Sequence, residues 1–345
     1  MKEPSSHRAD RGGASRLIYG YAGGAKRGAR GTALAVAAAR GIDQGLGAMR
    51  LARPVLLVSG FWRSGTTWLQ ECMAVALGAK TVFEPLSPME GRRAAHLKRL
   101  YPADDEDLCQ ATIPGPWPAE DEAWTYLDRA CASRFASEYL MSCRRTVAES
   151  FRLGIVVKDV RLQANLPAFH ARYGTPVIHV RRHPCAVVAS LITANWHWSF
   201  ERAPLAMLLP RLGGALSEAE RARALSFDTD ALHRIAALWA VTERLAATHL
   251  AGRAWGALAS YERFSADPAA VMAELCRALG LVQRTAVDFS QPSASVHPEA
   301  FAAYGTAPRE RWRTLLSPDE INAVHAVADA IYPDWRRGCE PAHAA

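Results

Sequence analysis

A turn rich in glycine and hydroxyl residues is the strongest chemical signal in this sequence. In the run Gly60-Phe-Trp-Arg-Ser-Gly-Thr-Thr67, four residues separate two glycines, between an apolar stretch and a helical pattern. At such a turn the backbone N–H groups point together, and the helix N-terminus adds partial positive charge. The threonine hydroxyls can also donate to anionic oxygens. The pattern therefore predicts a binding site for a phosphate or sulfate group.

The cation of this turn stands in an unusual place for a nucleotide-binding loop. In the P-loop of NTPases a lysine follows the second glycine directly, and the next hydroxyl residue binds Mg²⁺. Here Thr66 follows Gly65, and the cation is Arg63, inside the turn. Without the lysine, metal-assisted transfer of a γ-phosphate loses its main positive charge, whereas an arginine can bind a bridging oxygen and a terminal sulfonate together. A P-loop kinase or NTPase that lacks the usual lysine stays open as the alternative.

A second group of anion-binding residues follows another apolar run, Val177–Val180. Arg182 comes directly after this predicted strand, a helix pattern opens at Pro184, and Ser190 is eight residues beyond Arg182. The strand and the helix would bring the arginine and the serine to one anion. The neighbouring Arg181 is an extra cation whose direction the sequence does not give. The alternative is an arginine-rich strand end that pairs with surface carboxylates.

The run Arg63-Ser-Gly-Thr-Thr-Trp68 resembles the 5′-phosphosulfate motif of PAPS-dependent sulfotransferases, which reads basic-Ser-Gly-Thr-Thr-Trp. PAPS is 3′-phosphoadenosine 5′-phosphosulfate. Arginine at the first place is typical of bacterial members and of those that modify carbohydrates. Arg182, Pro184 and Ser190 match the spacing of the family's 3′-phosphate motif, although His183 stands where that motif usually has Asn or Asp.

Two later segments resemble the same family more weakly. Tyr261 stands where family members have a tyrosine beside the adenine, and Arg309 and Arg311 resemble a late basic loop that closes over the nucleotide. The resemblance runs from about residue 54 to residue 335 and implies PAPS as the donor substrate, with no metal ion required. The residues that it implies for nucleotide binding are Arg63, Ser64, Gly65, Thr66, Thr67, Trp68, Arg182, Ser190, Tyr261, Arg309 and Arg311.

The resemblance also implies where the base for the acceptor hydroxyl lies. Cytosolic members carry a histidine two residues after a lysine, but here Lys158 is followed by Asp159 and Val160. Carbohydrate-type members use a glutamate at the end of the strand after the loop, and Glu84 matches that place. The pattern implies Glu84 as general base, with Asp159 as the reserve candidate. Arg63 and Lys158 would lie close to the transferred group.

We expect the environment of Glu84 to favour proton transfer. A glutamate at the mouth of a cleft loses part of its hydration, and burial raises the pKa of a carboxyl group. A pKa raised in this way would suit a general base. The alternative is that Glu84 is a turn carboxylate held by Arg92 or Arg93.

The elements that would carry these residues alternate between strand and helix. Short apolar runs predict strands at 54–59, 155–157, 177–180 and 254–260. Asp267 and the capping-box sequence Ser317–Glu320 predict two further helix starts. Buried strands that alternate with helices are typical of a parallel sheet. The prediction is an α/β fold with a P-loop-like central parallel sheet, helices on both faces, and helical or loop insertions.

The domain organisation follows from the same pattern. We expect a single sulfotransferase domain over residues 51–340, after a basic arm over residues 1–50. The stretches near 90–150 and 196–230 interrupt the alternation, so we interpret them as insertions that carry acceptor specificity.

The positive charge of the chain lies in the arm. The chain has 41 basic and 34 acidic residues. Residues 1–53 hold ten of the basic and three of the acidic residues, so the rest of the chain has 31 of each. A neutral remainder argues against a nucleic-acid-binding fold. We expect the arm to be flexible and to become helical near Thr32–Met49. A weak contact of the arm with the inner face of a membrane is the alternative.

The seven cysteines form no C-x-x-C pair, and no His/Cys group has the spacing of zinc ligands. They predict reduced thiols in a cytoplasmic protein. The combined expectation is an enzyme that transfers a sulfuryl group from PAPS to a hydroxyl of a carbohydrate, or of a small-molecule or lipid-linked alcohol. A catalytically silent nucleotide-binding scaffold is a further alternative, and a homo-oligomer stays open.

Overall fold

A computed structural model describes residues 29–87, 114–291, 293 and 310–337 of the chain. Its strands are β1 (Arg53–Gly60), β2 (Lys80–Phe83), β3 (Gly154–Asp159), β4 (Val177–Arg181) and β5 (Gly256–Ser260). They form one sheet in the order β2-β3-β1-β4-β5, and all four pairings are parallel. The predicted α/β class and the central parallel sheet are confirmed.

Strand β1 lies in the middle of the sheet, and from Leu56 onward its residues are buried on both faces. Leu56, Leu57 and Val58 have no exposed surface, as expected for a central parallel strand. In register, Ser59 pairs with Asp159 of β3, and Gly60 pairs with Val180 of β4. The turns after β1, β3 and β4 therefore start side by side at the carboxyl edge of the sheet, where ligands bind in folds of this kind.

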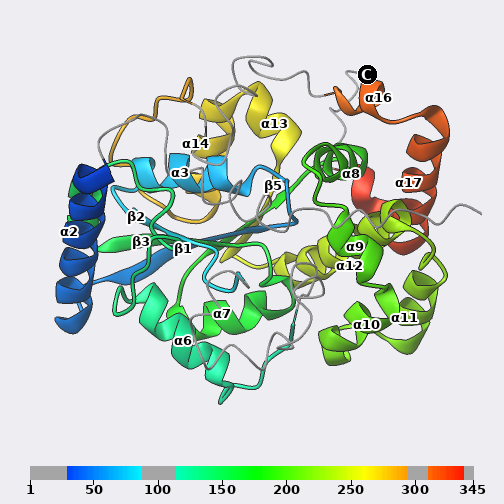
Figure 1. Ribbon diagram of the computed structural model, residues 1–345. Coiled ribbons are helices and arrows are strands. Elements are labelled where there is room, and N and C mark those ends of the chain that lie inside the picture. Colours follow the sequence, from blue (N-terminus) through cyan, green and yellow to red (C-terminus); the bar gives the residue numbers. More distant parts are fainter. Residues whose placement is uncertain (1–28, 88–113, 292, 294–309, 338–345) are drawn as a thin grey trace, which may run out of the picture.

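Helices cover both faces of the sheet (Figure 1). The longer ones are α2 (Ala29–Ala48), α3 (Thr66–Ala76), α6 (Glu122–Cys131), α7 (Leu166–Tyr173), α8 (Pro184–Thr193), α11 (Glu218–Leu225), α12 (Ala231–Leu250), α14 (Pro268–Ala278) and α17 (Pro318–Ile331). The shorter ones are α9 (Trp198–Arg202), α10 (Leu205–Leu208), α13 (Tyr261–Ala266), α16 (Trp312–Leu315), η3 (Val147–Phe151), η4 (Gln163–Asn165), η5 (Leu209–Ala215) and η6 (Pro333–Arg336).

Alternating side chains of β1 divide the core into two layers. Leu56 and Val58 pack with α3, α13 and α14 on one face. Leu57 packs with α6, α7 and the end of α12 on the other face. A third cluster joins α8, α12 and α17 around Trp239 and Trp335. This third cluster holds α8 beside the sheet, which matters because α8 carries Ser190.

The local helix signals in the sequence are also confirmed. Asp267 caps α14 by accepting a hydrogen bond from Ala270 N. Ser317 and Glu320 form the predicted capping box at the start of α17. The stretch 196–230 holds α9, α10 and α11 instead of strands.

Helix α2 is attached to the sheet by a buried ion network. Asp43 lies 2.8 Å from Lys80 Nζ and 2.7 Å from Arg144 Nη1. All three side chains are almost fully buried. The helical part of the basic arm therefore packs against the first residue of β2, and residues 1–28 lie outside the described residues. Within the described ranges, no helix is both long and apolar enough to cross a bilayer.

Candidate functional site

The turn after β1 has the backbone shape of an anion site. Arg63 and Gly65 both have left-handed φ values, 66° and 84°. The first hydrogen bond of α3 runs from Leu69 N to Gly65 O. The backbone N–H groups of Gly65 to Trp68 therefore have no partner inside the helix. These amides and the helix dipole favour a negatively charged group at this end of α3.

Gly65 is required for space as well as for its φ value. A Cβ atom at this position would lie 2.3 Å from Cδ2 of Tyr261. Tyr261 begins α13 directly after β5, so the last strand brings its ring against the turn. The Arg182 guanidinium lies over the same ring, 4.4 Å from its centroid, at cation–π distance. Tyr261 thus packs between the two predicted nucleotide motifs.

The two arginine motifs meet in space. Arg63 Nε donates to Ser190 Oγ at 3.0 Å. Arg182 Nη1 donates to the carbonyl oxygen of Arg63 at 2.7 Å, across 119 residues of sequence. The fold therefore gathers Arg63, Arg182, Ser190 and Tyr261 at the N-terminus of α3.

Two buried donors in this cluster fit an anionic ligand. Among the described residues, Ser64 Oγ and Arg182 Nε are buried and have no hydrogen-bond partner. Leaving such groups unsatisfied costs about 1–3 kcal/mol each, and more for a charged group. A ligand with several anionic oxygens would pair with both donors and with the helix amides.

The remaining residues of the predicted nucleotide site are Thr66, Thr67, Trp68, Arg309 and Arg311. Thr66 and Thr67 are buried in the first turn of α3. The ring of Trp68 packs on Phe264 at 4.4 Å between centroids, which attaches α3 to α13. Arg311 precedes α16, a helix that contacts α8. Arg309 lies outside the described residues, so its predicted role is not tested.

Glu84 and Lys158 come together at the neighbouring strand ends. Glu84 follows β2 with a φ of 36° and forms an ion pair with Lys158. Its second carboxylate oxygen lies 3.3 Å from Arg161 Nη1 and accepts a hydrogen bond from the Tyr139 hydroxyl. The Lys158 ammonium also lies over the Phe83 ring. The sequence placed Glu84 and Lys158 at these strand ends but missed Arg161 and Tyr139.

Arg161 connects the Glu84–Lys158 ion pair to the anion turn. Its guanidinium lies 5.2 Å from the Trp62 ring centroid, and Trp62 is the residue before Arg63. Gln163 Nε2 also donates to Gly60 O at 2.7 Å, which ties the turn after β3 to the end of β1. The carboxylate of Glu84 and the amides of the turn therefore line one edge of the sheet.

A model of the sulfotransferase family matches residues 54–284, about two thirds of the chain. The chain belongs to the sulfotransferase family. The matched residues include both arginine motifs, Glu84 and Lys158, so the resemblance seen in the sequence is confirmed for the family. The assignment to a carbohydrate-type branch stays a prediction.

Solved structures with a similar chain are also sulfotransferases. A sulfotransferase domain from the curacin biosynthetic pathway is 16% identical, with 79% of this chain and 96% of that chain covered and a TM-score of 0.42. A sulfotransferase from Mycobacterium tuberculosis is 16% identical over 92% of this chain and 90% of its own, with a TM-score of 0.40. No curated protein sequence matches the chain.

The expected rise in the pKa of Glu84 is wrong for this sulfotransferase. Burial acts to raise the pKa, but the charges and hydrogen bonds of Lys158 and Arg161 outweigh it, so the pKa lies below the usual value. Desolvation alone predicted a higher pKa, and the second cation, Arg161, reverses the direction. A signal was available, because Arg161 follows Lys158 by three residues at a strand end. Arg92 and Arg93, the other partners considered for Glu84, lie outside the described residues.

Asp159, the reserve base, has a different environment. Burial raises its pKa to about 6. Its two oxygens accept hydrogen bonds from Leu86 N at 2.8 Å and Arg161 N at 2.7 Å. These bonds connect the turn after β2 to the turn after β3. In this arrangement Asp159 supports the position of Glu84 and Arg161.

Arg181, whose direction was not readable from the sequence, points away from the anion turn. Its Nε donates to Glu243 at 3.2 Å, and its Nη2 donates to the Tyr332 hydroxyl at 2.6 Å. His179 Nε2 lies 3.1 Å from the same Glu243 carboxylate. These buried groups join β4 to α12 and to the end of α17, so Arg181 stabilises the packing of these elements.

His183, which replaces the usual Asn or Asp of the motif, caps α8. Its Nδ1 accepts a hydrogen bond from Cys185 N at 3.2 Å, and its ring stacks on Trp312 at 4.4 Å. Burial and the nearby His325 lower the pKa of His183 to about 3. The ring is therefore neutral at neutral pH, and it supplies the turn hydrogen bond without adding charge.

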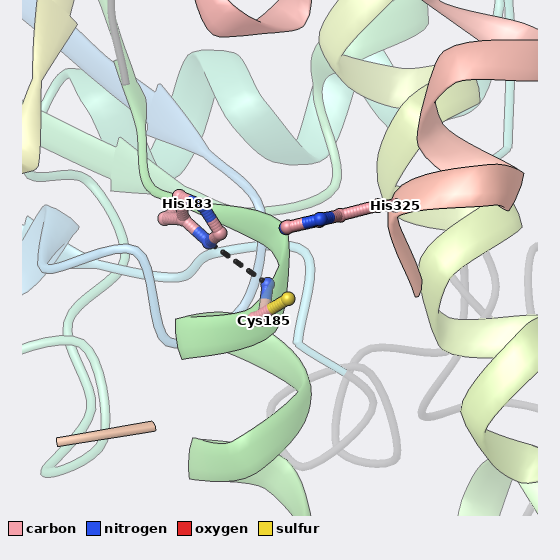
Figure 2. Close-up of side chains that lie close together, drawn as sticks. All are labelled: His183, Cys185 and His325. Carbon is pink, nitrogen blue, oxygen red and sulfur yellow. Dashed lines mark hydrogen bonds between the residues drawn. The ribbon is translucent and has the colours of Figure 1, made fainter. Parts of the chain in front are cut away.

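The fold brings together one His/Cys group that the sequence spacing did not reveal. His183, Cys185 and His325 place their ligand atoms within 4.8 Å of one another (Figure 2). Because Nδ1 of His183 accepts the hydrogen bond from Cys185 N, the neutral ring carries its proton on Nε2. Burial also raises the pKa of the Cys185 thiol to about 12. A metal ion at this position would have to break the cap of α8 and remove a proton from the thiol.

Proposed function

We propose that this sulfotransferase transfers the sulfuryl group of PAPS to an acceptor hydroxyl, giving a sulfate ester and PAP (adenosine 3′,5′-bisphosphate). The observation that carries the proposal is the meeting of Arg63, Arg182 and Ser190 at the N-terminus of α3. PAPS has two anionic ends, the 5′-phosphosulfate and the 3′-phosphate. A cluster with two guanidinium groups and a row of helix amides suits such a ligand.

Each end of the donor has its own set of partners in this proposal. The 5′-phosphosulfate accepts hydrogen bonds from the amides of Gly65 to Trp68 and from Arg63. The 3′-phosphate binds Arg182 and Ser190, and the adenine lies near Tyr261. The hydrogen bond from Arg63 to Ser190 would then open as both side chains turn to the ligand. Arg309 and Arg311 stay proposed as late contacts with the nucleotide.

The reaction needs little covalent chemistry from the protein. The acceptor oxygen forms a bond to sulfur in line with the bridging phosphate oxygen, whose bond to sulfur breaks. The hydroxyl proton passes to Glu84, and the charge on the departing PAP is stabilised by Arg63 and the turn amides. No step in this scheme uses a metal ion.

A movement of Lys158 would make Glu84 a stronger base. In the described structure Lys158 is paired with Glu84. If Lys158 turns to the oxygens of the sulfuryl group, one of the two cations that lower the pKa of Glu84 leaves it. The pKa of the carboxylate then rises when the donor is bound, which improves proton transfer.

The acceptor in this proposal is a hydroxyl of a carbohydrate or of a small-molecule or lipid-linked alcohol. The carbohydrate leads because Glu84 precedes a proline, as in carbohydrate-type members. A screen of acceptors with radiolabelled PAPS distinguishes these classes. We also propose a cytoplasmic location, because the five cysteines that lie in the described residues are free thiols.

Binding of PAP in the presence of EDTA tests the donor directly. We expect calorimetry to show binding without Mg²⁺, and Arg182→Ala to weaken it by about tenfold or more, because a charged hydrogen-bond donor is lost. Arg253→Ala, at an exposed arginine in the turn before β5, is the matched control and should leave the affinity unchanged. Binding of ATP only with Mg²⁺, and none of PAP, would instead support the kinase or NTPase alternative.

A further inference from the structure

A patch of large apolar side chains is exposed at the amino edge of the sheet. Its members, here called the amino-edge patch, are Met49, Leu51, Phe151 and Leu153, with exposed fractions of 62%, 47%, 63% and 47%. Met49 and Leu51 come from the segment between α2 and β1, Phe151 ends η3, and Leu153 directly precedes β3. Isolated exposed apolar residues are common, but a group gathered from two segments marks an interaction surface.

Backbone contacts hold the two segments side by side. Arg53 N donates to Leu153 O at 3.0 Å, which begins the pairing of β1 with β3. On the other side of the patch, Lys80 Nζ binds both Asp43 of α2 and the carbonyl oxygen of Ser150. These bonds place the residues before Phe151 against α2.

Helix α2 extends the apolar surface. Asp43 and Gly47 face the protein, and the opposite side carries Leu34 with 72% of its surface exposed. The other exposed positions between Leu34 and the end of the helix are Ala37, Ala38, Gly41, Gln44, Gly45 and Ala48. A solvent-facing helix side usually carries charged residues, but none of these exposed positions from Leu34 onward is charged. In Figure 1, α2 stands at the far left, beside the tail of β1.

The charged residues around the patch are positive. Arg50 directly precedes Leu51, and Arg53 follows it by two residues; both arginines are exposed. Arg152 separates Phe151 from Leu153. Between residue 34 and residue 53 the one acidic residue is Asp43, which is buried with Lys80. The nearest carboxylate on the η3 side, Glu149, is partly buried and accepts hydrogen bonds from the amides of residues 145 and 146. Residues 1–28 add further basic residues in sequence.

We propose that the amino-edge patch binds the surface of an anionic phospholipid membrane. Apolar side chains flanked by arginines match the boundary between acyl chains and negatively charged headgroups. The charge complementarity selects a lipid surface over a neutral protein partner. Because the patch lies at the amino edge and the anion turn at the carboxyl edge, bound enzyme keeps its donor site turned toward water.

Flotation of the full chain with vesicles tests this proposal. The probes are vesicles of phosphatidylcholine alone and vesicles that contain about 30 mol% phosphatidylglycerol. We expect binding to the second kind, and weaker binding when NaCl rises from about 0.1 to about 0.5 M, because salt screens the arginines. The triple variant Met49→Ser, Leu51→Ser, Phe151→Ser should bind about tenfold less, because three apolar side chains no longer enter the membrane.

The matched control replaces exposed apolar residues elsewhere on the surface. Met207→Ser, Leu258→Ser and Val282→Ser change side chains with exposed fractions of 47%, 44% and 71%. This triple variant should bind vesicles as the unchanged protein does. Both variants should keep the unfolding temperature and the affinity for PAP, since all six side chains are at least 44% exposed and none belongs to the predicted nucleotide site.

Three results would overturn the proposal. The first is equal vesicle binding by the patch variant and the unchanged protein, which would assign binding to the arm alone. The second is equal binding to neutral and anionic vesicles. The third is absence of vesicle binding together with a dimer, seen by sedimentation velocity, that the patch variant converts to a monomer. That result would make a second copy of the chain the partner.

Discussion

Gly65 illustrates how one residue can serve the backbone and the packing at once. Its φ of 84° disfavours any residue with a Cβ atom, and the Tyr261 ring occupies the space where a Cβ would stand. The sequence suggested the first requirement through the glycine spacing. The second depends on β5, nearly 200 residues later, and could not be read from the turn itself.

Gly65→Ala should therefore destabilise the protein by more than backbone strain alone. A left-handed alanine costs about 1–2 kcal/mol, and the collision with Tyr261 adds to this value. Gly174→Ala is the matched control, because Gly174 has a φ of 63° and open space around it. Urea unfolding measures both changes. Equal losses in the two variants would show that Tyr261 moves away at no cost and does not position the turn.

The identity of the base can be decided by the pH dependence of the rate. A general base works when it is ionised, so activity falls as the pH drops through its pKa. The pKa of Glu84 lies below its usual value, whereas that of Asp159 is raised to about 6. If Glu84 is the base, the acidic limb of kcat/KM for PAPS, which reports the enzyme before the donor binds, lies below the usual range of a glutamate. A limb near pH 6 that disappears in Asp159→Asn would contradict the proposal for Glu84.

At the scale of elements, the sequence predicted what is local. The strands β1, β3, β4 and β5 coincide with the short apolar runs, and α8, α14 and α17 begin at the predicted capping or proline signals. These signals depend on neighbours within four residues. The ion pairs between Asp43 and Lys80, and between Glu84 and Arg161, join separate elements. Periodic patterns do not encode such pairs, and the effect of Arg161 was missed although it follows Lys158 by three residues, so the pKa of Glu84 was predicted in the wrong direction.

The attachment of α2 leads to a stability prediction. Asp43→Ala would leave Lys80 and Arg144 without their buried carboxylate, and breaking a buried ion pair costs about 3–5 kcal/mol. Burial already lowers the pKa of Lys80 despite Asp43, so part of this cost would be relieved by loss of the lysine's proton.

The control is an ion pair on the surface. Glu274→Ala removes the partner of Arg263, a pair in which both side chains are more than half exposed, and should cost less than about 1 kcal/mol. Urea unfolding of the two variants gives the comparison. Similar losses would show that α2 is not held by Asp43.

For the whole molecule, the order of the sheet explains why distant motifs form one site. Because β1 lies between β3 and β4, the turn at Arg63 adjoins both the Glu84–Lys158 group and the Arg182 strand end. The class of the sheet could be predicted from the sequence but its strand order could not, since pairing between strands depends on the whole core. The opposite edge of the same sheet carries the amino-edge patch, so donor binding and membrane contact would occupy separate surfaces.

The central claim is that this sulfotransferase uses PAPS with Glu84 as base. Its most direct test is the release of PAP from PAPS in EDTA, with an acceptor found by screening, for the unchanged protein and for Glu84→Gln. We predict acceptor-dependent turnover that falls by about 10²–10⁴-fold in Glu84→Gln, while the affinity for PAP stays within about threefold. Absence of turnover with every acceptor, or an unchanged rate in Glu84→Gln, would contradict the claim.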